Sequence, residues 1–354
     1  MHKTRTTMNA TADRAPMPGG RPSPSFIAAM EAAVRSQLAS TLLPGGVSSD
    51  IRMIEYEGRR YCLKQALPKL KVEADWRAPV ARNHSEAEWL RVAGEIVPGA
   101  VPRVLYEDQR QGWFAMEYLA PDRHPVWKSQ LRDGIIDAGF ARMVGQRLAR
   151  IHAVTAGDQD IAARFANDDI FYPIRAEPYL IATGRAHPDL APRLQALSDA
   201  TMRTQRALVH GDVSPKNILA GADGPVFLDA ECAWYGDPAF DLAFVLNHLL
   251  LKCVWRPLWT ARYLQSFDAL ADAYLRNARW EPAAELEART AHLLPGLLLG
   301  RVDGKSPAEY ITAEGDKKRI RNVARALLLQ PVDSLAVIRD AWAASMASPA
   351  APEN

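Results

Sequence analysis

The feature that most constrains the fold is a change of periodicity at Pro121, which divides the chain into a strand-rich part and a helical part. Before Pro121, short apolar runs of strand length are separated by turn residues, and one segment has the apolar spacing of a helix. The runs are Ile51–Tyr56, Tyr61–Leu67, Val104–Glu107 and Trp113–Leu119, the helical segment is Asn83–Ala93, and the turns are Glu57-Gly58 and Asp108–Gly112. This order predicts a small α+β lobe whose two hairpins form an antiparallel sheet.

The chain upstream of this lobe divides into a polar start and one helix. The first residues mix Thr, Pro, Gly and Arg with almost no large apolar side chain, so we expect residues 1–24 to be a disordered tail. Ser23 and Pro24 are typical of a helix start, and Phe26, Met30 and Val34 follow at helical spacing. We therefore place the N-terminal lobe at residues 25–119.

The part that follows, residues 120–354, is predicted to be a larger and mainly helical lobe. Apolar residues recur with a helical period around Phe140–Ile151 and Tyr263–Leu275, and further helices are expected at Glu281–Leu294, Asp316–Leu329 and Asp333–Ala344. Three short runs in its middle have strand character, namely Ala207–His210, Ile218–Ala220 and Val226–Leu228, with a turn at Ala222-Asp223-Gly224.

Composition narrows the class of protein. Of 354 residues, 48% are apolar and 24% are charged, which is ordinary for a globular protein. Because 43 basic residues nearly balance 41 acidic ones, the net charge does not favour binding to nucleic acid or anionic membranes. The three cysteines form no paired motif, which argues against a zinc cluster or a disulfide framework. No uninterrupted apolar run approaches the roughly 20 residues of a membrane span. We expect a cytoplasmic protein; its oligomeric state stays open.

One segment carries a set of residues suited to phosphoryl transfer. His210–Asn217 has the sequence HGDVSPKN, and Phe227–Glu231 has the sequence FLDAE. Such chemistry needs one carboxylate that orients the attacking hydroxyl and accepts its proton, and hard oxygen ligands that hold Mg²⁺ against nucleotide phosphates. Asp212 and Asn217 have the spacing of the catalytic loop of protein kinases, and Asp229 falls where a metal-binding Asp would follow.

These two motifs, with the continuation LDAECAWYGDPAFDLA, resemble the aminoglycoside phosphotransferase and choline kinase superfamily from about Gly45 to Arg301. The resemblance implies a protein-kinase-like two-lobed fold and an ATP- and Mg²⁺-dependent small-molecule kinase. It assigns Asp212 as catalytic base, Asn217 and Asp229 as metal ligands, and Glu231 as a second carboxylate at the metal site. It also implies that buried Asp241 braces the catalytic loop and that His210 is a scaffold residue; the alternative for Asp241 is a helix N-terminal role.

The N-terminal lobe should supply the nucleotide site, and Lys64 is its main candidate. A lysine within an apolar strand is costly to bury unless anions pair with it, and kinases use a strand lysine to hold phosphates and to pair with a helix Glu. The partner is Glu86 or Glu88. Glu86 lies three and four positions before Trp89 and Leu90, on the apolar face of its helix, so we choose Glu86.

Two backbone segments complete the predicted nucleotide site. Small residues at Gly45–Asp50, including Gly46 and Ser48, would let backbone N–H groups approach phosphate oxygens, although a simple turn explains them equally well. The resemblance places Met116, Glu117 and Tyr118 at the hinge whose backbone binds adenine.

The acceptor is the least determined part of the function. Lys64–Pro68 and Val101–Tyr106 resemble methylthioribose kinases, but Asn217 follows the broader family. In methylthioribose kinases, arginines at a comparable place bind the substrate. We therefore take Arg301, which we expect in a loop at 300–307, as a substrate-binding candidate. The alternative is a solvated arginine that caps the preceding helix. We expect a neutral or anionic hydroxylated metabolite such as a sugar or sugar derivative. The competing hypotheses are an aminoglycoside phosphotransferase and a catalytically silent binding protein. A protein kinase is disfavoured because the sequence lacks the Gly-rich loop and the Asp-Phe-Gly and Ala-Pro-Glu motifs of that class.

Overall fold

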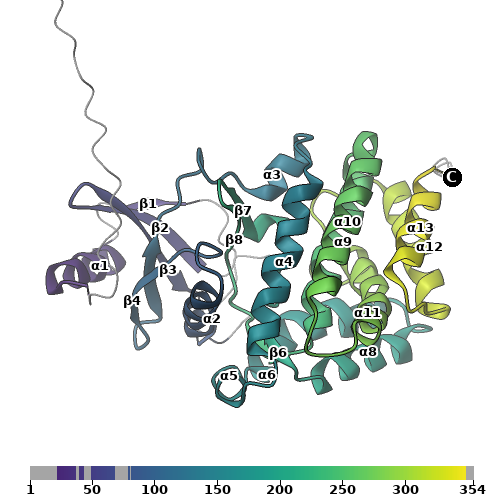
Figure 1. Ribbon diagram of the computed structural model, residues 1–354, viewed down its shortest axis with the longest axis horizontal. Helices are drawn as coiled ribbons and strands as arrows, with labels where there is room; N and C mark the ends of the chain where they lie inside the picture. The colour runs from purple at the N-terminus through teal and green to yellow at the C-terminus, as the bar shows by residue number, and fades with distance from the viewer. Residues whose placement is uncertain (1–21, 37–39, 44–48, 68–78, 80, 348–354) are drawn as a thin grey trace, which may run out of the picture.

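The computed structural model describes residues 22–36, 40–43, 49–67, 79 and 81–347 of the chain. A small lobe with a five-stranded sheet lies at one end, and a larger, mainly helical lobe forms the rest (Figure 1). The α+β two-lobed fold expected from the sequence is therefore confirmed. The predicted tail falls mostly on residues 1–21, which lie outside the described residues, and helix α1 already begins at Pro24.

The sheet of the small lobe has the order β1-β2-β3-β5-β4, and each neighbouring pair is antiparallel. Its strands are β1 (Ser40–Leu42), β2 (Ser49–Tyr56), β3 (Arg59–Ala66), β4 (Val104–Asp108) and β5 (Trp113–Glu117). Both predicted hairpins are present. Glu57 and Gly58 make the first turn with φ values of 50° and 70°, a conformation that glycine adopts without strain. The short strand β1 was not predicted, and β5 ends two residues earlier than expected.

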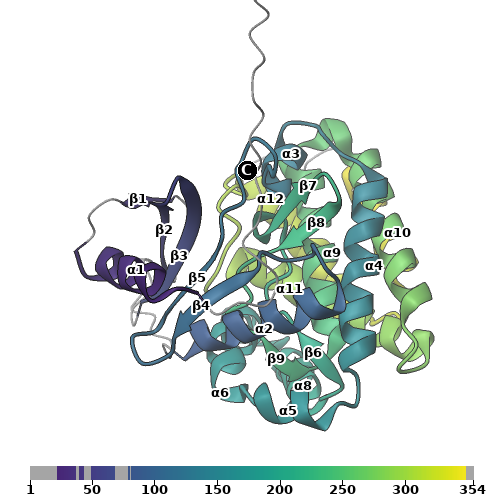
Figure 2. The ribbon, with the colours of Figure 1, turned by 60° about the vertical axis from the view of Figure 1, so that its left-hand side comes forward.

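Alternation along the strands gives the sheet two apolar faces. Tyr61 and Leu63 on β3 pack with helix α1 (Pro24–Ser36), whereas Cys62, between them, packs in the main core with helix α2 (Arg82–Ile96). In Figure 2, α1 lies on the outer side of the sheet and α2 between the sheet and the helical lobe. Helix α2 therefore connects the cores of the two lobes.

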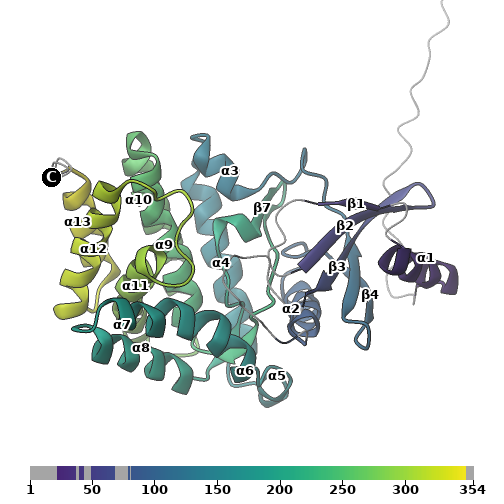
Figure 3. The same ribbon diagram turned by 180° about the vertical axis from the view of Figure 1, so that it is seen from behind.

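The helical lobe is built around α9 (Pro238–Trp255), which is buried along nearly its whole length and packs against α10 and α11. The other helices are α3 (Trp127–Arg132), α4 (Ala138–Thr155), α5 (Gln159–Arg164), α6 (Asp168–Phe171), α7 (Ala182–Ala186), α8 (Ala191–Arg203), α10 (Thr260–Asn277), α11 (Ala283–Asp303), α12 (Glu314–Leu329) and α13 (Leu335–Ala347), with a π-helix at Tyr172–Ile181 and 3₁₀ turns at Pro215–Asn217 and Pro257–Trp259. Figure 3 shows α12 and α13 at the end farthest from the sheet.

Helix α9 also accounts for the most apolar stretch of the chain. It has 18 residues and a mean hydropathy of 1.2, which is long and apolar enough to cross a membrane, but 94% of it is buried inside the protein. A helix that is apolar on all sides is stable in water only when other elements surround it. The burial of α9 is therefore that of a core helix.

Two small sheets lie where the lobes meet. Strand β6 (Ala207–Val209) pairs with β9 (Trp234–Gly236), and β7 (Ile218–Gly221) pairs with β8 (Gly224–Phe227), all antiparallel. The three predicted strands and the turn between the last two are confirmed. Strand β9 was missed because three residues carry too little periodicity to identify a strand.

One prediction about the helical lobe was wrong. A helix was expected to stop at Leu294 and a loop to span 300–307, but α11 continues through Pro295 to Asp303. The glycines of this stretch serve helix packing rather than termination. A Cβ at Gly300 would lie 2.4 Å from the carbonyl oxygen of Tyr179, so only glycine lets α11 approach the π-helix this closely.

Candidate active site

The segment after β6 is held in place by a buried carboxylate. Asp241, on α9, accepts hydrogen bonds from the backbone N–H of His210 at 2.7 Å and of Gly211 at 2.8 Å. Gly211 has a φ of 79°, and a Cβ there would lie 2.6 Å from the carbonyl oxygen of Cys232. The bracing role expected for Asp241 is therefore present as two charge-assisted hydrogen bonds, and Gly211 permits the turn that they stabilise.

His210 joins the two halves of the motif. Its Nδ1 accepts a hydrogen bond from the backbone N–H of Asp212, and its Nε2 donates to the carbonyl of Leu228, which directly precedes Asp229. Burial lowers the pKa of His210, which favours the neutral imidazole that this pattern of one donor and one acceptor requires. His210 thus has the scaffold position that the sequence predicted.

Asp212 lies buried at the end of this segment, and two cations approach its carboxylate. Nη2 of Arg175 is 2.8 Å from Oδ2, and Nζ of Lys216 is 3.4 Å from the same oxygen. Arg175 comes from the π-helix, where its Nε also donates to the carbonyl of Gly211. Arg175 therefore lies buried against the candidate base.

Asn217 and Asp229 are brought together by the β7–β8 hairpin. The side-chain amide nitrogen of Asn217 donates to the carbonyl of Asp212, so the amide oxygen is the atom of this side chain that could bind a metal. The backbone N–H of Leu228 donates to the carbonyl of Asn217. Asp229 follows with a φ of 66°, a region that residues other than glycine rarely adopt and that is found preferentially at functional sites.

Lys64 meets two carboxylates between the lobes. Its Nζ lies 2.6 Å from Oε2 of Glu86 and also forms an ion pair with Asp229. The expected pair with Glu86 is present, whereas Glu88 binds Arg91 and Arg164 on the surface. Burial by itself lowers the pKa of Lys64, but the two carboxylates outweigh it and the net shift is upward. The ammonium therefore stays charged.

The carboxylate of Glu231 has a partner that the sequence did not reveal. Nε of Arg82, a fully buried residue at the start of α2, lies 3.1 Å from Oε2 of Glu231. Arg82 also donates to the backbone carbonyls of Leu67 and Pro79. Glu231 therefore helps to hold α2 against residues 227–231, in addition to lying close to Lys64.

The remaining candidates are placed as follows. Met116 and Glu117 end β5, where Glu117 exchanges backbone and side-chain hydrogen bonds with Arg103, and Tyr118 follows the strand. Gly46 and Ser48 lie outside the described residues.

Arg301 does not lie in a loop, contrary to expectation. It belongs to the last turn of α11, is 8% exposed, and donates through Nη1 to Tyr179 and to the carbonyl and hydroxyl of Ser306. The expectation failed because a Gly-Arg pair was taken as the end of a helix.

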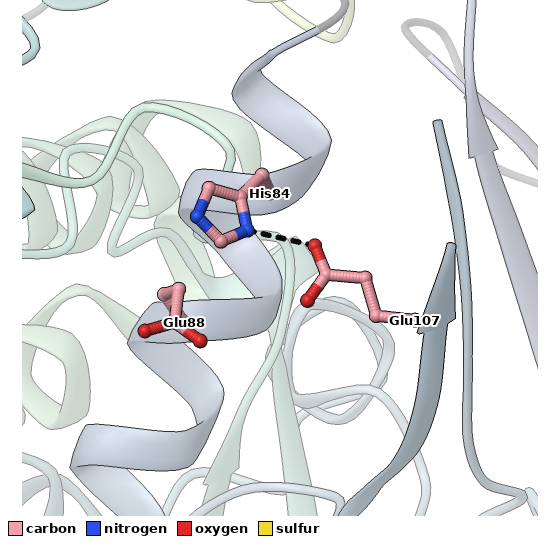
Figure 4. A group of neighbouring side chains, drawn as sticks. All are labelled: His84, Glu88 and Glu107. Carbon is pink, nitrogen blue, oxygen red and sulfur yellow. Dashed lines mark hydrogen bonds and ion pairs between the residues drawn. The ribbon is translucent and has the colours of Figure 1, made fainter. Parts of the chain in front are cut away.

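A second group of potential ligands lies on the outer side of α2. His84, Glu88 and Glu107 could offer one ligand atom each within 4.8 Å of one another, and Nδ1 of His84 lies 2.8 Å from Glu107, as Figure 4 shows. Both carboxylates are bonded to Arg91, however, and Glu88 also to Arg164. The arginines already neutralise the charge that a cation would need, so the group is explained as a surface ion-pair network.

The chain matches a family model described as the phosphotransferase enzyme family over residues 40–286. Among curated proteins, the methylthioribose kinase of Pectobacterium carotovorum subsp. carotovorum is 26% identical over 222 residues, which cover 54% of this chain and 54% of that protein. The methylthioribose kinase of Geobacillus kaustophilus is 26% identical over 267 residues, 67% of each chain. The chain thus matches between about half and two thirds of the length of these relatives.

Solved structures share the fold at low identity. A choline/ethanolamine kinase family protein from Mesorhizobium loti superposes with a TM-score of 0.50 at 16% identity, covering 92% of this chain and 99% of that chain. A choline kinase from Cryptosporidium parvum Iowa II superposes with a TM-score of 0.51 at 12% identity, covering 82% and 90%. These likenesses show a protein-kinase-like architecture and nothing finer. With a family model that spans most of its length, the chain belongs to the phosphotransferase enzyme family.

Proposed function

We propose that the protein is an ATP-dependent kinase that transfers the γ-phosphoryl group to a hydroxyl of a small metabolite. The observation that carries this proposal is the convergence of Asp212, Asn217 and Asp229 from one lobe with the Lys64–Glu86 pair from the other. This arrangement supports the proposal because a candidate base, two candidate oxygen ligands and a buried cation meet between the lobes. Catalysis of phosphoryl transfer rests mainly on such positioning and charge stabilisation.

In the proposed mechanism, Asp212 receives and orients the acceptor hydroxyl and takes its proton as the oxygen attacks in line. Arg175 fixes the orientation of the carboxylate through the 2.8 Å contact. Lys64 would neutralise the α- and β-phosphates of ATP, and Glu86 would hold the ammonium of Lys64 in position through their 2.6 Å contact. Asp241 and His210 act as positioning residues, because Asp241 accepts hydrogen bonds from the two backbone N–H groups that precede Asp212 and the His210 ring accepts one from the N–H of Asp212 itself.

The donor set suits Mg²⁺, which prefers carboxylate and carbonyl oxygens. Asn217 would offer its amide oxygen and Asp229 its carboxylate; Glu231 would contribute through the oxygen that Arg82 does not hold. When bound, the metal supplies neutralisation of the phosphate charge and a template for the phosphate oxygens.

The same proposal extends to the lobes and the acceptor. We assign nucleotide binding to residues 25–119, with Met116, Glu117 and Tyr118 as the adenine hinge and Gly46 and Ser48 near the phosphates. Residues 120–354 then supply catalysis and acceptor binding. We further propose a cytoplasmic enzyme with a hydroxylated small-molecule acceptor, and no nucleic acid or membrane partner.

The experiment that tests the function is ATP consumption by purified protein with Mg²⁺ against sugars, methylthioribose, choline, amino alcohols and aminoglycosides. We expect turnover with at least one sugar, methylthioribose, choline or an amino alcohol. The Asp212→Ala variant should lose this turnover but keep its affinity for the nucleotide, which calorimetry measures. Asp223→Ala, an exposed aspartate in the β7–β8 turn, is the matched control and should retain activity. Turnover of aminoglycosides alone, or full activity of Asp212→Ala, would contradict the proposal.

A further inference from the structure

One face of α9 carries two basic side chains into the interior of the helical lobe. His248 and Lys252 follow Phe244 at intervals of four residues, so the three side chains lie above one another at steps of about 6 Å. Lys252 is 1% exposed, yet within the part of the chain that the structure describes its ammonium has neither a hydrogen bond nor an ion pair. Its contacts are the rings of Tyr310, at 3.9 Å from the centroid, and Trp255, at 4.6 Å.

Further cations surround this face. Arg301 and Lys216 lie close enough to act on the charge of His248, and Lys128 lies 5.5 Å from the centroid of the Tyr310 ring. The carboxylate of Glu309, beside that ring, is paired with Lys128. Burial lowers the pKa values of His248 and Lys252, and the neighbouring cations lower them further. The carboxylate that acts on the charge of Lys252, that of Glu309, is thus already paired with Lys128.

Hydrogen-bond donors in the same place are also unused. The hydroxyl of Tyr310 and Nε of Arg301 are both buried and have no hydrogen-bond partner among the described residues. A buried donor without a partner costs free energy, and most buried donors in proteins are paired. An acceptor of negative charge would satisfy both donors and the ammonium of Lys252 together.

This cluster is connected to the candidate base. Arg175, which contacts Asp212 at 2.8 Å, has its guanidinium 5.7 Å from the ring centroid of Phe244, and the rings of Phe244 and His248 are 5.3 Å apart. Arg301 reaches the same region through Tyr179, whose ring centroid is 5.9 Å from both arginines. The cluster thus begins next to Asp212 and extends along α9 from Phe244 to Lys252, a rise of about 12 Å.

We infer that Lys252, His248 and Arg301 form a subsite for an anionic group, a carboxylate or a phosphate, carried by the acceptor whose hydroxyl is presented to Asp212. This inference rests on the proposed function, because it assigns the acceptor end of the same site. Cationic acceptors are excluded by the same geometry. The aromatic faces of Trp255 and Tyr310, which attract cations, are already occupied by the protein's own ammonium.

The test compares acceptors that share a six-carbon skeleton and differ in charge. Binding of gluconate, glucose 6-phosphate, glucose and glucosamine is measured by calorimetry with Mg²⁺ and a non-hydrolysable ATP analogue present, and inorganic phosphate serves as a minimal probe. We expect gluconate or glucose 6-phosphate, or phosphate alone, to bind more tightly than glucose and glucosamine. The tighter of the first two identifies a carboxylate or a phosphate as the group recognised.

Three variants assign the binding to the cluster. Lys252→Met keeps the volume between the rings and removes the charge, and it should weaken anion binding by about tenfold or more, as expected for a lost charge-assisted hydrogen bond. Lys252→Arg should retain most of the affinity. Lys318→Met, an exposed lysine on α12, should behave as the wild type. Circular dichroism of each variant checks that the fold is kept.

The outcomes separate the two proposals. Equal or tighter binding of glucose or glucosamine, no anion binding to the wild type, or unchanged anion affinity in folded Lys252→Met overturns the subsite. Anion binding that depends on Lys252 in a protein that consumes no ATP with any acceptor would support the subsite and contradict the kinase. Turnover of an acceptor that is unchanged by substitution of Lys252 would support the kinase and contradict the subsite.

Discussion

At the scale of single residues, burial and pairing set the charges of the site. Burial raises the pKa of Glu86 to about 7, and Lys64 opposes that rise. Asp229 shows the opposite balance: burial alone would raise its pKa, but Lys64 and Lys216 together hold it below the usual range. Asp229 therefore remains ionised over the physiological range, which a metal ligand requires.

Lys64 gives the first prediction. Lys64→Ala should raise the KM for ATP by about tenfold to a hundredfold, the loss expected when a charge-assisted contact to phosphate is removed, with a smaller fall in kcat. Steady-state kinetics at saturating acceptor measure both constants. Lys318→Ala, on the exposed face of α12, serves as control. Unaltered ATP kinetics in the Lys64 variant would show that the lysine only pairs with carboxylates.

His248 gives a prediction about pH. Burial, followed by Arg301, Lys252 and other cations, lowers its pKa well below the ordinary 6.5. The unfolded chain therefore binds a proton below pH 6.5 that the folded protein does not, so stability is fully present above 6.5 and is lost as pH falls. Relative to His248→Gln, the wild type should lose about 1.4 kcal/mol of unfolding free energy between pH 7.5 and pH 5.5. Urea titrations of both proteins measure the difference; parallel pH dependences would refute it.

At the scale of elements, glycines set how closely helices approach. Gly145 on α4 faces α10, and a Cβ there would lie 2.4 Å from the carbonyl oxygen of Leu270. Gly315, near the start of α12, has no neighbouring atom within 4 Å of the same position. The helical lobe therefore depends on a glycine at one contact and tolerates a side chain at the other.

This contrast makes a matched pair of variants. Gly145→Ala should destabilise the protein by about 1–3 kcal/mol, because the clash is with backbone and the helices must move apart. Gly315→Ala should change stability by less than about 0.5 kcal/mol. Chemical denaturation monitored by circular dichroism compares the two. Equal effects would mean that α4 and α10 adjust freely.

At the scale of the whole molecule, one core continues from the sheet into the helical lobe. It includes Cys62 and Met116 on the sheet, α2, and α9 to α11. Trp89 on α2 is fully buried and packs edge-on against His210 at 4.7 Å and against Phe227 at 6.3 Å. The lobes should therefore unfold together. Trp89 is a main contact between α2 and the chain around His210 and Phe227.

Trp89→Ala tests this continuity. We expect a loss of about 3–5 kcal/mol, typical for a buried aromatic, and a fall in kcat because His210 loses its support. Leu258→Ala, at a side chain that is 87% exposed, should stay within about 0.5 kcal/mol of the wild type. Calorimetry and activity assays give both quantities. Full activity with two separated transitions in the wild type would show that the lobes are independent.

Much of the candidate site could be predicted because its key residues are local. Asp212, Asn217 and Asp229 lie within one short segment, and the β7–β8 hairpin brings Asn217 and Asp229 together. The inward direction of Lys64 follows from strand alternation, and the choice of Glu86 follows from the apolar face of α2. Periodicity and turn chemistry depend only on near neighbours, so the sequence by itself determined these features.

Packing decided the rest. Arg82 and Glu231 pair across 149 positions, and Arg175 reaches Asp212 only because the π-helix packs beside α9. Arg301 was misplaced because Gly300, which by local rules ends a helix, instead allows α11 to touch the π-helix. Nothing in the sequence around Lys252 indicates that its side chain is buried without an ion-pair partner among the described residues. Such contacts depend on which surfaces meet after folding, and a pattern of neighbouring residues does not encode that choice.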